Sequence, residues 1–258
     1  MCRYLSPDER TKIQERVRDA GFLSLFLDFD GTLTPIVADP AEARLDPRVR
    51  GTLQSQAVRD DTLLAFVSGR ALDDLRPRVG IERAVYAGNH GLEITGRNVA
   101  FVEPSALAKR ELLNQIVDQL TAALRHIPGA LVENKNLTAS VHYRRAARHA
   151  AAITEIVQAA LAPHVSFFRL NRGKMVLEIV PLTSCDKGSA VSWINAQLGM
   201  AGAPSIYIGD DRTDEDAFSH LRGEITIQVG RNKKTSARYF VADPTEVHSF
   251  LEWLSDNR

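Results

Sequence analysis

The chain has 258 residues, of which 44% are hydrophobic and 25% charged, an ordinary composition for a globular protein with one large domain or two smaller ones. Its 32 lysines and arginines balance 32 aspartates and glutamates, so no net basic field favours a nucleic-acid partner. No apolar run is long enough to span a bilayer, and the charged N-terminal segment lacks the apolar stretch of a secretory signal. Two cysteines, Cys2 and Cys185, indicate neither a disulfide framework nor a cysteine-ligated metal. We therefore expect a soluble, cytoplasmic protein that binds neither nucleic acid nor membranes.

The first elements of the chain are a predicted helix and a predicted buried strand. Residues 7–20 have helical periodicity, with Ser6 as the N-cap and Pro7 in the first turn. The apolar residues 25–27 then predict a strand that is buried on both faces of a parallel sheet.

Two acids follow this strand, and their spacing places them on one side of it. Asp28 and Asp30 are two positions apart, so their side chains should project together, away from Phe29. Neighbouring carboxylates repel unless a cation or a shared proton compensates, and a divalent metal is the simplest compensation. The alternative is a pair of ordinary strand-end acids. The apolar strand before them and Gly31-Thr32 after them favour a functional site.

A second strand and helix repeat this arrangement. Residues 46–59 predict a helix, and residues 62–67 predict a buried strand that ends in Ser68-Gly69. A helix from about Leu72 would direct backbone N–H groups and the Ser68 hydroxyl toward an anion, although Ser-Gly alone is usually only a turn. Arg70 either faces this site or is solvated at the start of the helix, and we favour the second interpretation.

The next segment, residues 84–94, predicts a strand, a glycine-bracketed turn and another strand. His90 lies in this turn, either as a solvent-facing residue or as a substrate contact. We favour substrate contact, because a histidine between glycines is unlike the usual core histidine.

Residues 105–180 have the pattern of a separate domain. They predict helices at 105–125 and 146–161 and strands at 130–134, 137–143, 165–170 and 175–180, with turns at 134–136 and 171–174. This order predicts an antiparallel sheet with helices on one face. We therefore expect an inserted α+β domain at residues 103–181, between two parts of a parallel core at residues 1–102 and 182–258.

Polar residues occupy unusual positions in this inserted domain. Glu133 and Lys135 flank a hairpin turn, and Glu178 interrupts an otherwise apolar strand. His142 and Arg144 are two positions apart on the second predicted strand, so they should share a face. A solvated sheet face explains each residue alone. The whole set fits better with binding of a hydroxyl-rich ligand.

The core resumes with a helix start and another strand that ends in acids. Lys187 falls in the first turn of a helix, where the macrodipole disfavours a cation, so we expect it to have an anion or carboxylate partner. A buried strand at residues 205–209 ends in Asp210 and Asp211. The acids at 214–216 are explained by the first turn of the following helix, with Thr213 as its N-cap. Strands at 225–229 and 239–241 and a helix from about Thr245 complete the chain.

The functional groups at these strand ends should converge, because the carboxyl ends of parallel strands form the ligand crevice of an open α/β sheet. Oxygen ligands without a histidine or cysteine cluster indicate Mg²⁺, with Asp28, Asp30 and Asp210 as the predicted ligands. No phosphate-binding loop or Ser-His-Asp order is evident, so the nucleophile should be a carboxylate or a metal-bound water.

Mg²⁺ held by one or two carboxylates usually also binds a substrate phosphate. If the nucleophile is a carboxylate, Asp28 attacks the phosphorus of this phosphate to give an aspartyl-phosphate, and Asp30 serves as acid and then as base. Ser68 orients the phosphoryl group, and Lys187 neutralises its charge together with that of Asp28. The predicted catalytic residues are therefore Asp28, Asp30, Ser68 and Lys187.

Several of these segments resemble a known family. Asp28-Phe29-Asp30-Gly31-Thr32 resembles the first motif of the haloacid dehalogenase superfamily, and Ser68 matches its second motif. The similarity narrows to the trehalose-6-phosphate phosphatases over the region from Leu25 to Gly230. The segments that carry it are Gly88–Gly91, Glu133–Lys135, Val141–Arg144, Gly173–Pro181, Asp186–Gly188 and Gly209–Glu215.

The resemblance implies an α/β fold with a Rossmann-like parallel-sheet core and an inserted α+β cap. It also implies Mg²⁺-dependent hydrolysis of trehalose 6-phosphate to trehalose and phosphate, with a trehalose-6-phosphate synthase upstream in the pathway. The sugar-binding residues that it implies are Glu133, Lys135, Arg144 and Glu178, in addition to His90.

Three other functions stay open at this point. The chain could hydrolyse another glycosyl phosphate, isomerise a sugar phosphate as a phosphomutase, or bind a sugar phosphate without turning it over. A sensor need not keep a nucleophile, so the presence of Asp28, Asp30, Lys187 and Asp210 argues against the last of these.

Overall fold

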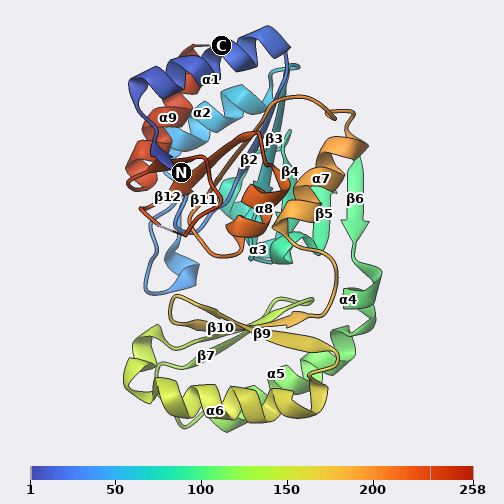
Figure 1. The fold of residues 1–258 in the computed structure, drawn as a ribbon. Helices are drawn as coiled ribbons and strands as arrows, with labels where there is room; N and C mark the ends of the chain where they lie inside the picture. The colour runs from blue at the N-terminus through green and yellow to red at the C-terminus, as the bar shows by residue number, and fades with distance from the viewer. Residues whose placement is uncertain (1, 233, 258) are drawn as a thin grey trace. The chain divides into compact units, whose positions relative to one another are not determined.

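The computed structural model describes residues 2–232 and 234–257. The chain divides into two compact units (Figure 1). The core unit comprises the described residues up to Phe101 and from Cys185 onward, and the inserted unit comprises Val102–Ser184. Among the described residues, no helix combines the length and the apolar character needed to cross a membrane.

A mostly parallel sheet forms the centre of the core unit, as the sequence predicts. Among the described residues its strand order is β1-β13-β12-β11-β2-β3-β4-β5-β6. Neighbouring strands are parallel from β1 to β4, and β5 is antiparallel to β4. The strands are β1 Arg3–Tyr4, β2 Leu23–Leu27, β3 Thr62–Val67, β4 Val85–Gly88, β5 Glu93–Gly96, β6 Val99–Val102, β11 Ser205–Gly209, β12 Ile225–Val229 and β13 Tyr239–Val241.

Helices cover both faces of this sheet (Figure 1), which explains why strand β2 is buried along its whole length. Leu25 and Leu27 pack in one apolar cluster with residues of α1, α2, α3 and α9. Phe26, which points the other way, packs with residues of α7 and α8. The helices are α1 Pro7–Ala20, α2 Pro47–Ala57, α3 Leu72–Val79, α7 Lys187–Gln197, α8 Asp214–His220 and α9 Pro244–Asp256, with short 3₁₀ turns η1 Pro40–Glu42 and η2 Asn89–Gly91.

Two short edge strands of this sheet have no counterpart in the sequence prediction. β1 is only two residues long, and its residues are exposed. β6 alternates half-buried and exposed residues after a turn in which Arg97 and Asn98 adopt positive φ angles. β1 contains no apolar run, and β6 is apolar but has only four residues, fewer than β2 or β3.

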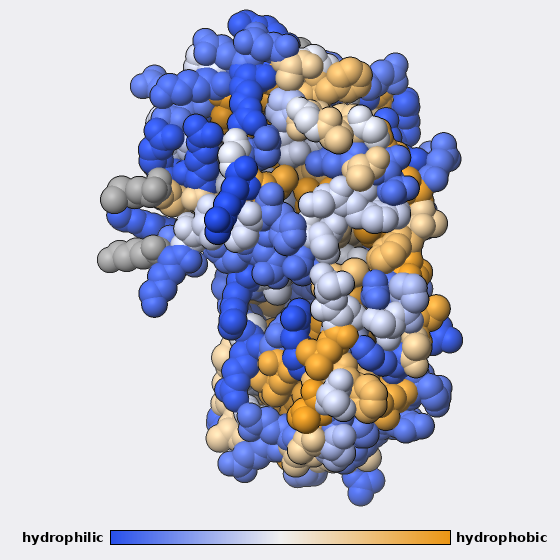
Figure 2. Space-filling view, turned by 45° about the vertical axis from the view of Figure 1, so that its right-hand side comes forward, coloured by the Kyte–Doolittle hydropathy of each residue, from blue (hydrophilic) through white to orange (hydrophobic). Residues whose placement is uncertain are grey.

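The inserted unit is an antiparallel sheet with helices on one face, which is the predicted arrangement. Its strand order is β7-β8-β10-β9, and the apolar sides of α5 and α6 pack against alternate residues of the central strands, including Val141 and Leu177. The elements are α4 Pro104–Ala108, α5 Arg110–Leu124, β7 Leu131–Asn134, β8 Ala139–His142, η3 Arg144–His149, α6 Ala150–Leu161, η4 Ala162–His164, β9 Phe168–Gly173 and β10 Val176–Pro181. Figure 2 shows apolar side chains, in orange, among hydrophilic ones on the visible face of this unit, and its exposed large hydrophobic residues include Leu131, Val165 and Phe167.

Two local predictions for the inserted unit are wrong. The helix predicted over residues 105–125 is two helices, because the chain breaks at Lys109, whose Nζ donates to the Leu182 carbonyl oxygen (2.8 Å). The turn predicted over residues 171–174 lies at Lys174 and Met175, and Met175 adopts a φ of 68°. Gly173 is a strand residue paired with Val176, where an added Cβ would lie 2.7 Å from Val176 Cγ1. Gly173 therefore allows the two strands to approach closely, and it is not needed for the turn.

Candidate active site

Asp28 follows strand β2 directly and is almost fully buried. Its backbone N–H donates to the Ile208 carbonyl oxygen (3.0 Å), which extends the pairing of β2 with β11 by one residue. Phe29 packs in the apolar cluster that contains Leu25 and Leu27, so Asp28 faces the other side of the strand. The carboxylate thus lies at the carboxyl end of the central strand of the sheet.

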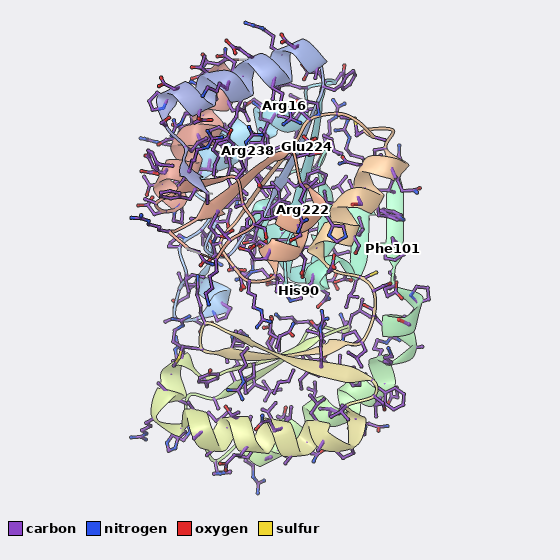
Figure 3. The ribbon with its side chains drawn as sticks, in the orientation of Figure 1. Arg16, His90, Phe101, Arg222, Glu224 and Arg238 are labelled. Atoms are coloured by element: carbon purple, nitrogen blue, oxygen red, sulfur yellow. The ribbon has the colours of Figure 1, made fainter. Side chains whose placement is uncertain are left out.

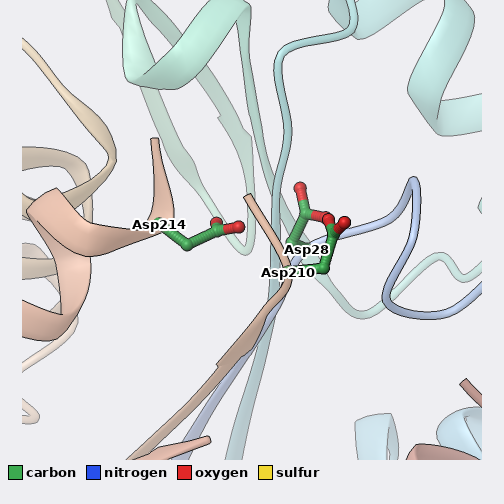
Figure 4. A group of neighbouring side chains, drawn as sticks. All are labelled: Asp28, Asp210 and Asp214. Atoms are coloured by element: carbon green, nitrogen blue, oxygen red, sulfur yellow. The ribbon is translucent and has the colours of Figure 1, made fainter. Parts of the chain in front are cut away.

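Two further carboxylates converge on Asp28 (Figure 4). Asp210 follows β11, and Asp214 is the first residue of α8. Asp28, Asp210 and Asp214 each offer a carboxylate oxygen, and these oxygens all lie within 4.8 Å of one another. Gly31 makes the approach of the two loops possible: it has a φ of +86°, and a Cβ there would lie 2.4 Å from Asp210 Oδ2.

A single buried ammonium group lies between two of these acids. Lys187 is the first residue of α7, behind the N-cap Asp186, and is 2% exposed. Its Nζ lies 2.8 Å from Asp28 Oδ1 and 2.7 Å from Asp214 Oδ1. Burial alone would lower the pKa of Lys187, but the charges of Asp214 and Asp28 outweigh burial and raise this pKa well above its ordinary value. The carboxylate partner predicted for a lysine in a first helical turn is therefore present.

Asp214 is the anchor of this lysine. It is fully buried, and its Oδ1 also accepts a hydrogen bond from the Tyr207 hydroxyl (2.7 Å). Its Oδ2 accepts from the Asp211 backbone N–H (2.9 Å). The sequence interpretation explained Asp214 only by the first turn of the helix, which is where it lies, and did not predict its contact with Lys187. The helical period carried a signal for burial, because Asp214 shares a face with Ala217 and Phe218, both buried.

Carboxylates gather at this site among the residues that the structure describes. Those of Asp28, Asp210 and Asp214 converge, and the Lys187 ammonium contacts two of them. Burial raises the pKa of Asp28 well above its ordinary value, and the carboxylates of Asp214 and Asp210 add to this effect against the opposing charge of Lys187. A divalent cation would offset these negative charges, and donors that are all carboxylate oxygens suit a hard cation. The acidic cluster can therefore hold a divalent metal.

This acidic cluster predicts a pH-dependent response to metal. Mg²⁺ at about 100 times its dissociation constant should stabilise the fold by about 2.7 kcal/mol, or roughly 5–10 °C in melting temperature. Because the folded-state pKa of Asp28 is raised, the metal-free protein gains stability from this group at low pH and loses it as pH rises through that pKa. Protons thus compete with the metal, so the Mg²⁺-induced shift should be large near pH 8 and small near pH 5.

Thermal melts with Mg²⁺ or with a chelator across this pH range measure the effect. Asp210→Asn is the matched control, since it removes one carboxylate of the cluster and leaves Lys187 with both partners. An Mg²⁺ shift of equal size at both ends of the pH range would contradict the assignment of Asp28 to the metal site.

Ser68 and His90 lie together at the ends of β3 and β4. Ser68 is buried, and its Oγ accepts from the Arg70 backbone N–H (3.2 Å). The His90 backbone N–H donates to the Ser68 carbonyl oxygen (2.9 Å). The imidazole of His90 packs over Gly69, where an added Cβ would lie 2.6 Å from its Cε1 atom. Figure 3 shows His90 at the end of the core unit where the parallel strands terminate.

Asp30 and Arg70 form a direct pair that the sequence interpretation missed. Arg70 is 7% exposed, so its assignment to a solvated helix start is wrong. Its Nε lies 2.6 Å from Asp30 Oδ2, and its Nη2 lies 2.7 Å from Asp30 Oδ1. The carboxylate of Asp30 is consequently bound to Arg70 and is not part of the group formed by Asp28, Asp210 and Asp214.

The polar residues of the inserted unit gather on the face of its sheet away from the helices. Glu133 and Glu178 are both paired with Ser140, so the three side chains lie in one row. Lys135 is buried, with its Nζ 3.9 Å from Glu133 Oε2 and 3.8 Å from Glu178 Oε1. His142 adds a contact of 2.8 Å from its Nε2 to Glu133 Oε2.

Arg144 does not share the strand face with His142. β8 ends at His142, and Tyr143 leaves the extended conformation with φ −132° and ψ 18°. Arg144 then begins the 3₁₀ turn η3, where it is exposed and its Nη2 donates to the Lys174 carbonyl oxygen (2.8 Å). The prediction of a shared face is therefore wrong, because the strand is shorter than its apolar pattern indicates.

Comparisons with known proteins identify the family of this chain. The family model described as trehalose-phosphatase matches residues 26–245. Trehalose-phosphate phosphatase B of Arabidopsis thaliana is 36% identical over 249 residues, which cover 89% of this chain and 65% of that protein.

The fold is also found in solved structures. The structure of the C. albicans trehalose-6-phosphate phosphatase C-terminal domain superposes with a TM-score of 0.81 at 23% identity and covers 99% of this chain and 98% of that one. A haloacid dehalogenase-like hydrolase from Bacteroides thetaiotaomicron has the same fold, with a TM-score of 0.63 at 17% identity over 90% of this chain and 99% of that one. The fold is thus that of the haloacid dehalogenase superfamily, and the chain belongs to the trehalose-phosphatase family.

Proposed function

We propose that this protein is an Mg²⁺-dependent phosphatase that hydrolyses trehalose 6-phosphate to trehalose and phosphate through an aspartyl-phosphate. One observation carries the proposal: the buried carboxylate of Asp28 lies at a strand end, in contact with the Lys187 ammonium and close to the Asp210 carboxylate. The ammonium offsets the charge of the Asp28 carboxylate, and the neighbouring carboxylate can help to hold a metal. A nucleophile that attacks a dianionic phosphate requires both. Membership of the trehalose-phosphatase family supports the choice of substrate.

Asp28 and Asp30 divide the chemistry between them in this proposal. Lys187 binds Asp28 Oδ1, and we assign the attack to Oδ2, which forms the bond to phosphorus as the bond from phosphorus to the sugar oxygen breaks. Asp30 gives its proton to that oxygen. It then takes a proton from the water that attacks the aspartyl-phosphate, which releases phosphate and restores both carboxyl groups.

The remaining core residues hold the phosphoryl group and the metal. Mg²⁺ would add positive charge next to the transferring phosphoryl group. Asp28 and Asp210 would hold it through their carboxylates, whereas the carboxylate of Asp30, the third predicted ligand, is bound to Arg70. Ser68 and the backbone N–H groups that precede α3 orient the phosphoryl oxygens. His90, packed over Gly69, is our proposed contact to the substrate at this end of the sheet.

The inserted unit supplies the sugar specificity in this proposal. Glu133, Lys135 and Glu178 place acceptors and a donor close together on one sheet face, with Lys135 Nζ 3.9 Å from Glu133 Oε2 and 3.8 Å from Glu178 Oε1. Arg144 contributes further donors from the adjoining 3₁₀ turn. Such an arrangement recognises a ligand with several hydroxyl groups and distinguishes a disaccharide from a simple alkyl or aryl group.

The pathway partner and the cellular location of this protein stay predictions. We predict a trehalose-6-phosphate synthase upstream of it and a cytoplasmic location for both. The level of trehalose 6-phosphate in cells with and without the gene tests the first prediction. Microscopy of the tagged protein tests the second.

A panel of sugar phosphates tests the proposed function directly. Phosphate release from trehalose 6-phosphate should exceed that from glucose 6-phosphate and other hexose phosphates by about 10²-fold or more in kcat/KM. Removal of Mg²⁺ with a chelator should abolish it, and added Mg²⁺ should restore it. Free phosphate and free sugar are both measured, because a mutase would form an isomeric sugar phosphate and a sensor would bind without turnover.

Glu133→Ala separates sugar recognition from phosphoryl transfer. It should lower kcat/KM for trehalose 6-phosphate by about 10-fold to 100-fold, because it removes hydrogen bonds to the sugar. Hydrolysis of a small aryl phosphate should change by less than about twofold, since that substrate has no hydroxyl groups to bind. Equal losses on both substrates would remove Glu133 from the sugar site.

A further inference from the structure

One arginine holds both carboxylate oxygens of Asp30. Arg70 Nε and Nη2 approach Asp30 Oδ2 and Oδ1 at 2.6 and 2.7 Å. Two parallel hydrogen bonds of this kind fix the plane of a carboxylate as well as its position. The Asp30 side chain keeps 36% of its surface exposed, so a reacting group can still approach this residue.

Arg70 is itself fixed from three directions. Its Nη1 lies 2.5 Å from Asp74 Oδ2, one turn further along the chain in α3, and its Nη2 also donates to the Pro40 carbonyl oxygen (2.9 Å). Its guanidinium carbon lies 5.4 Å from the centre of the Phe29 ring. With the arginine side chain only 8% exposed, the guanidinium has little freedom to move relative to the Asp30 loop.

We propose that Arg70 is a positioning residue for Asp30, which sets the orientation of this carboxyl group for proton transfer without itself contacting the substrate. The inference rests on the proposed function, in which Asp30 is the acid and base. Proton transfer requires the carboxyl oxygen to lie within hydrogen-bond reach of the sugar oxygen and later of water. An aspartate on a loop has two freely rotating side-chain torsions, and the guanidinium fork restricts both.

The alternative is that Arg70 only stabilises the local fold, and Arg78 provides a control for this alternative. Arg70 also links the segment that contains Pro40 to α3 through a hydrogen bond. Arg78 fastens the same segment, since its Nη1 donates to the carbonyl oxygens of Ala41 and Ala43 (3.1 Å each), and its Nη2 lies 2.6 Å from Asp74 Oδ1. No hydrogen bond or ion pair among the described residues joins Arg78 to Asp30.

Steady-state kinetics of three variants separate these roles. Arg70→Gln should lower kcat for trehalose 6-phosphate by about 10-fold to 100-fold and change KM by less than about twofold. Arg70→Lys should lose about as much, because an ammonium group keeps the charge but cannot bind both oxygens in one plane. Arg78→Gln should keep kcat within about twofold of the wild type. Full recovery in Arg70→Lys, or an equal loss in Arg78→Gln, would overturn the proposal.

A double-mutant cycle with Asp30→Asn gives the decisive readout, measured under single turnover with enzyme in excess. If Arg70 acts through Asp30, Arg70→Gln should alter the residual rate of Asp30→Asn by less than about twofold. If Arg70→Gln lowers the single-turnover rate by the same factor in the wild type and in Asp30→Asn, the positioning role is overturned. Arg70→Lys serves in the cycle if Arg70→Gln does not fold, as judged by thermal melting. Wild-type turnover by Asp30→Asn alone would instead overturn the acid and base assignment within the proposed function.

Discussion

Asparagine in place of Asp28 should abolish turnover of trehalose 6-phosphate while the fold stays intact. An amide oxygen is a poor nucleophile toward phosphorus, so kcat should fall by about 10⁴-fold or more. Asparagine has nearly the same shape as aspartate, and Lys187 keeps its contact with Asp214. The change also removes one of three converging negative charges, so the melting temperature should stay within a few degrees of the wild type. Phosphate release and thermal melting measure the two effects.

The intermediate on Asp28 can be observed separately. Asp30→Asn loses the acid of the first step and the base of the second, so a covalent phosphoryl group should accumulate with an aryl phosphate, whose leaving group needs no proton. Intact-protein mass spectrometry should then detect the added phosphoryl group, and the double variant with Asp28→Asn should lack it. Asp211→Asn is the matched control among the strand-end acids. Among the described residues, the Asp211 side chain accepts a local hydrogen bond from the Thr213 N–H (3.2 Å), which asparagine can also accept.

Phosphate release by Asp28→Asn at the wild-type rate would exclude Asp28 as the nucleophile. Attack by a metal-bound water, the other option that the sequence leaves open, would then be the better account. A covalent phosphoryl group on a residue other than Asp28 would reject the assignment while keeping the two-step mechanism.

The positions of the core site residues could be predicted because each follows a strong local signal. Asp28, Ser68 and Asp210 directly follow strands that are mostly apolar and fully buried, so the strand ends were easy to locate. Parallel strands bring their carboxyl ends to one edge, which makes the convergence a consequence of topology. Lys187 stood out because its position at a helix start is unfavourable without a partner.

The pairing of side chains within the site was harder to predict. Arg70 and Asp30 are 40 positions apart, and their contact depends on where the start of α3 lies relative to the loop after β2. No local pattern carries that information. Asp214 differs, because its helical spacing to Phe218 indicated burial, but the acids beside it at positions 215 and 216 masked the pattern. Similar acids in one helical turn can therefore have opposite surroundings.

Methionine in place of Lys187 should cause the largest loss of stability among these variants as well as loss of activity. Methionine fills a similar volume but leaves Asp28 and Asp214 buried without their shared counter-charge. Removing one partner from a buried ion pair costs about 3–5 kcal/mol, which corresponds to roughly 10 °C in melting temperature for a chain of this size. Turnover should fall by about 10²-fold or more, since the ammonium no longer offsets charge on the phosphoryl group.

The pH dependence of this loss identifies its cause. Lys187 opposes the burial effect on Asp28, so its removal should raise the pKa of Asp28 further. A carboxyl group whose pKa is raised by folding favours the folded state at low pH and disfavours it as pH rises through that pKa. The stability difference between Lys187→Met and the wild type, measured by denaturant unfolding without metal, should therefore shrink toward about pH 5. The double variant with Asp214→Asn should recover part of the stability and none of the turnover, because it removes a buried charge without restoring a cation. A stability loss that is independent of pH would point to packing of the lysine chain, and not to charge, as the contribution of Lys187 to the fold.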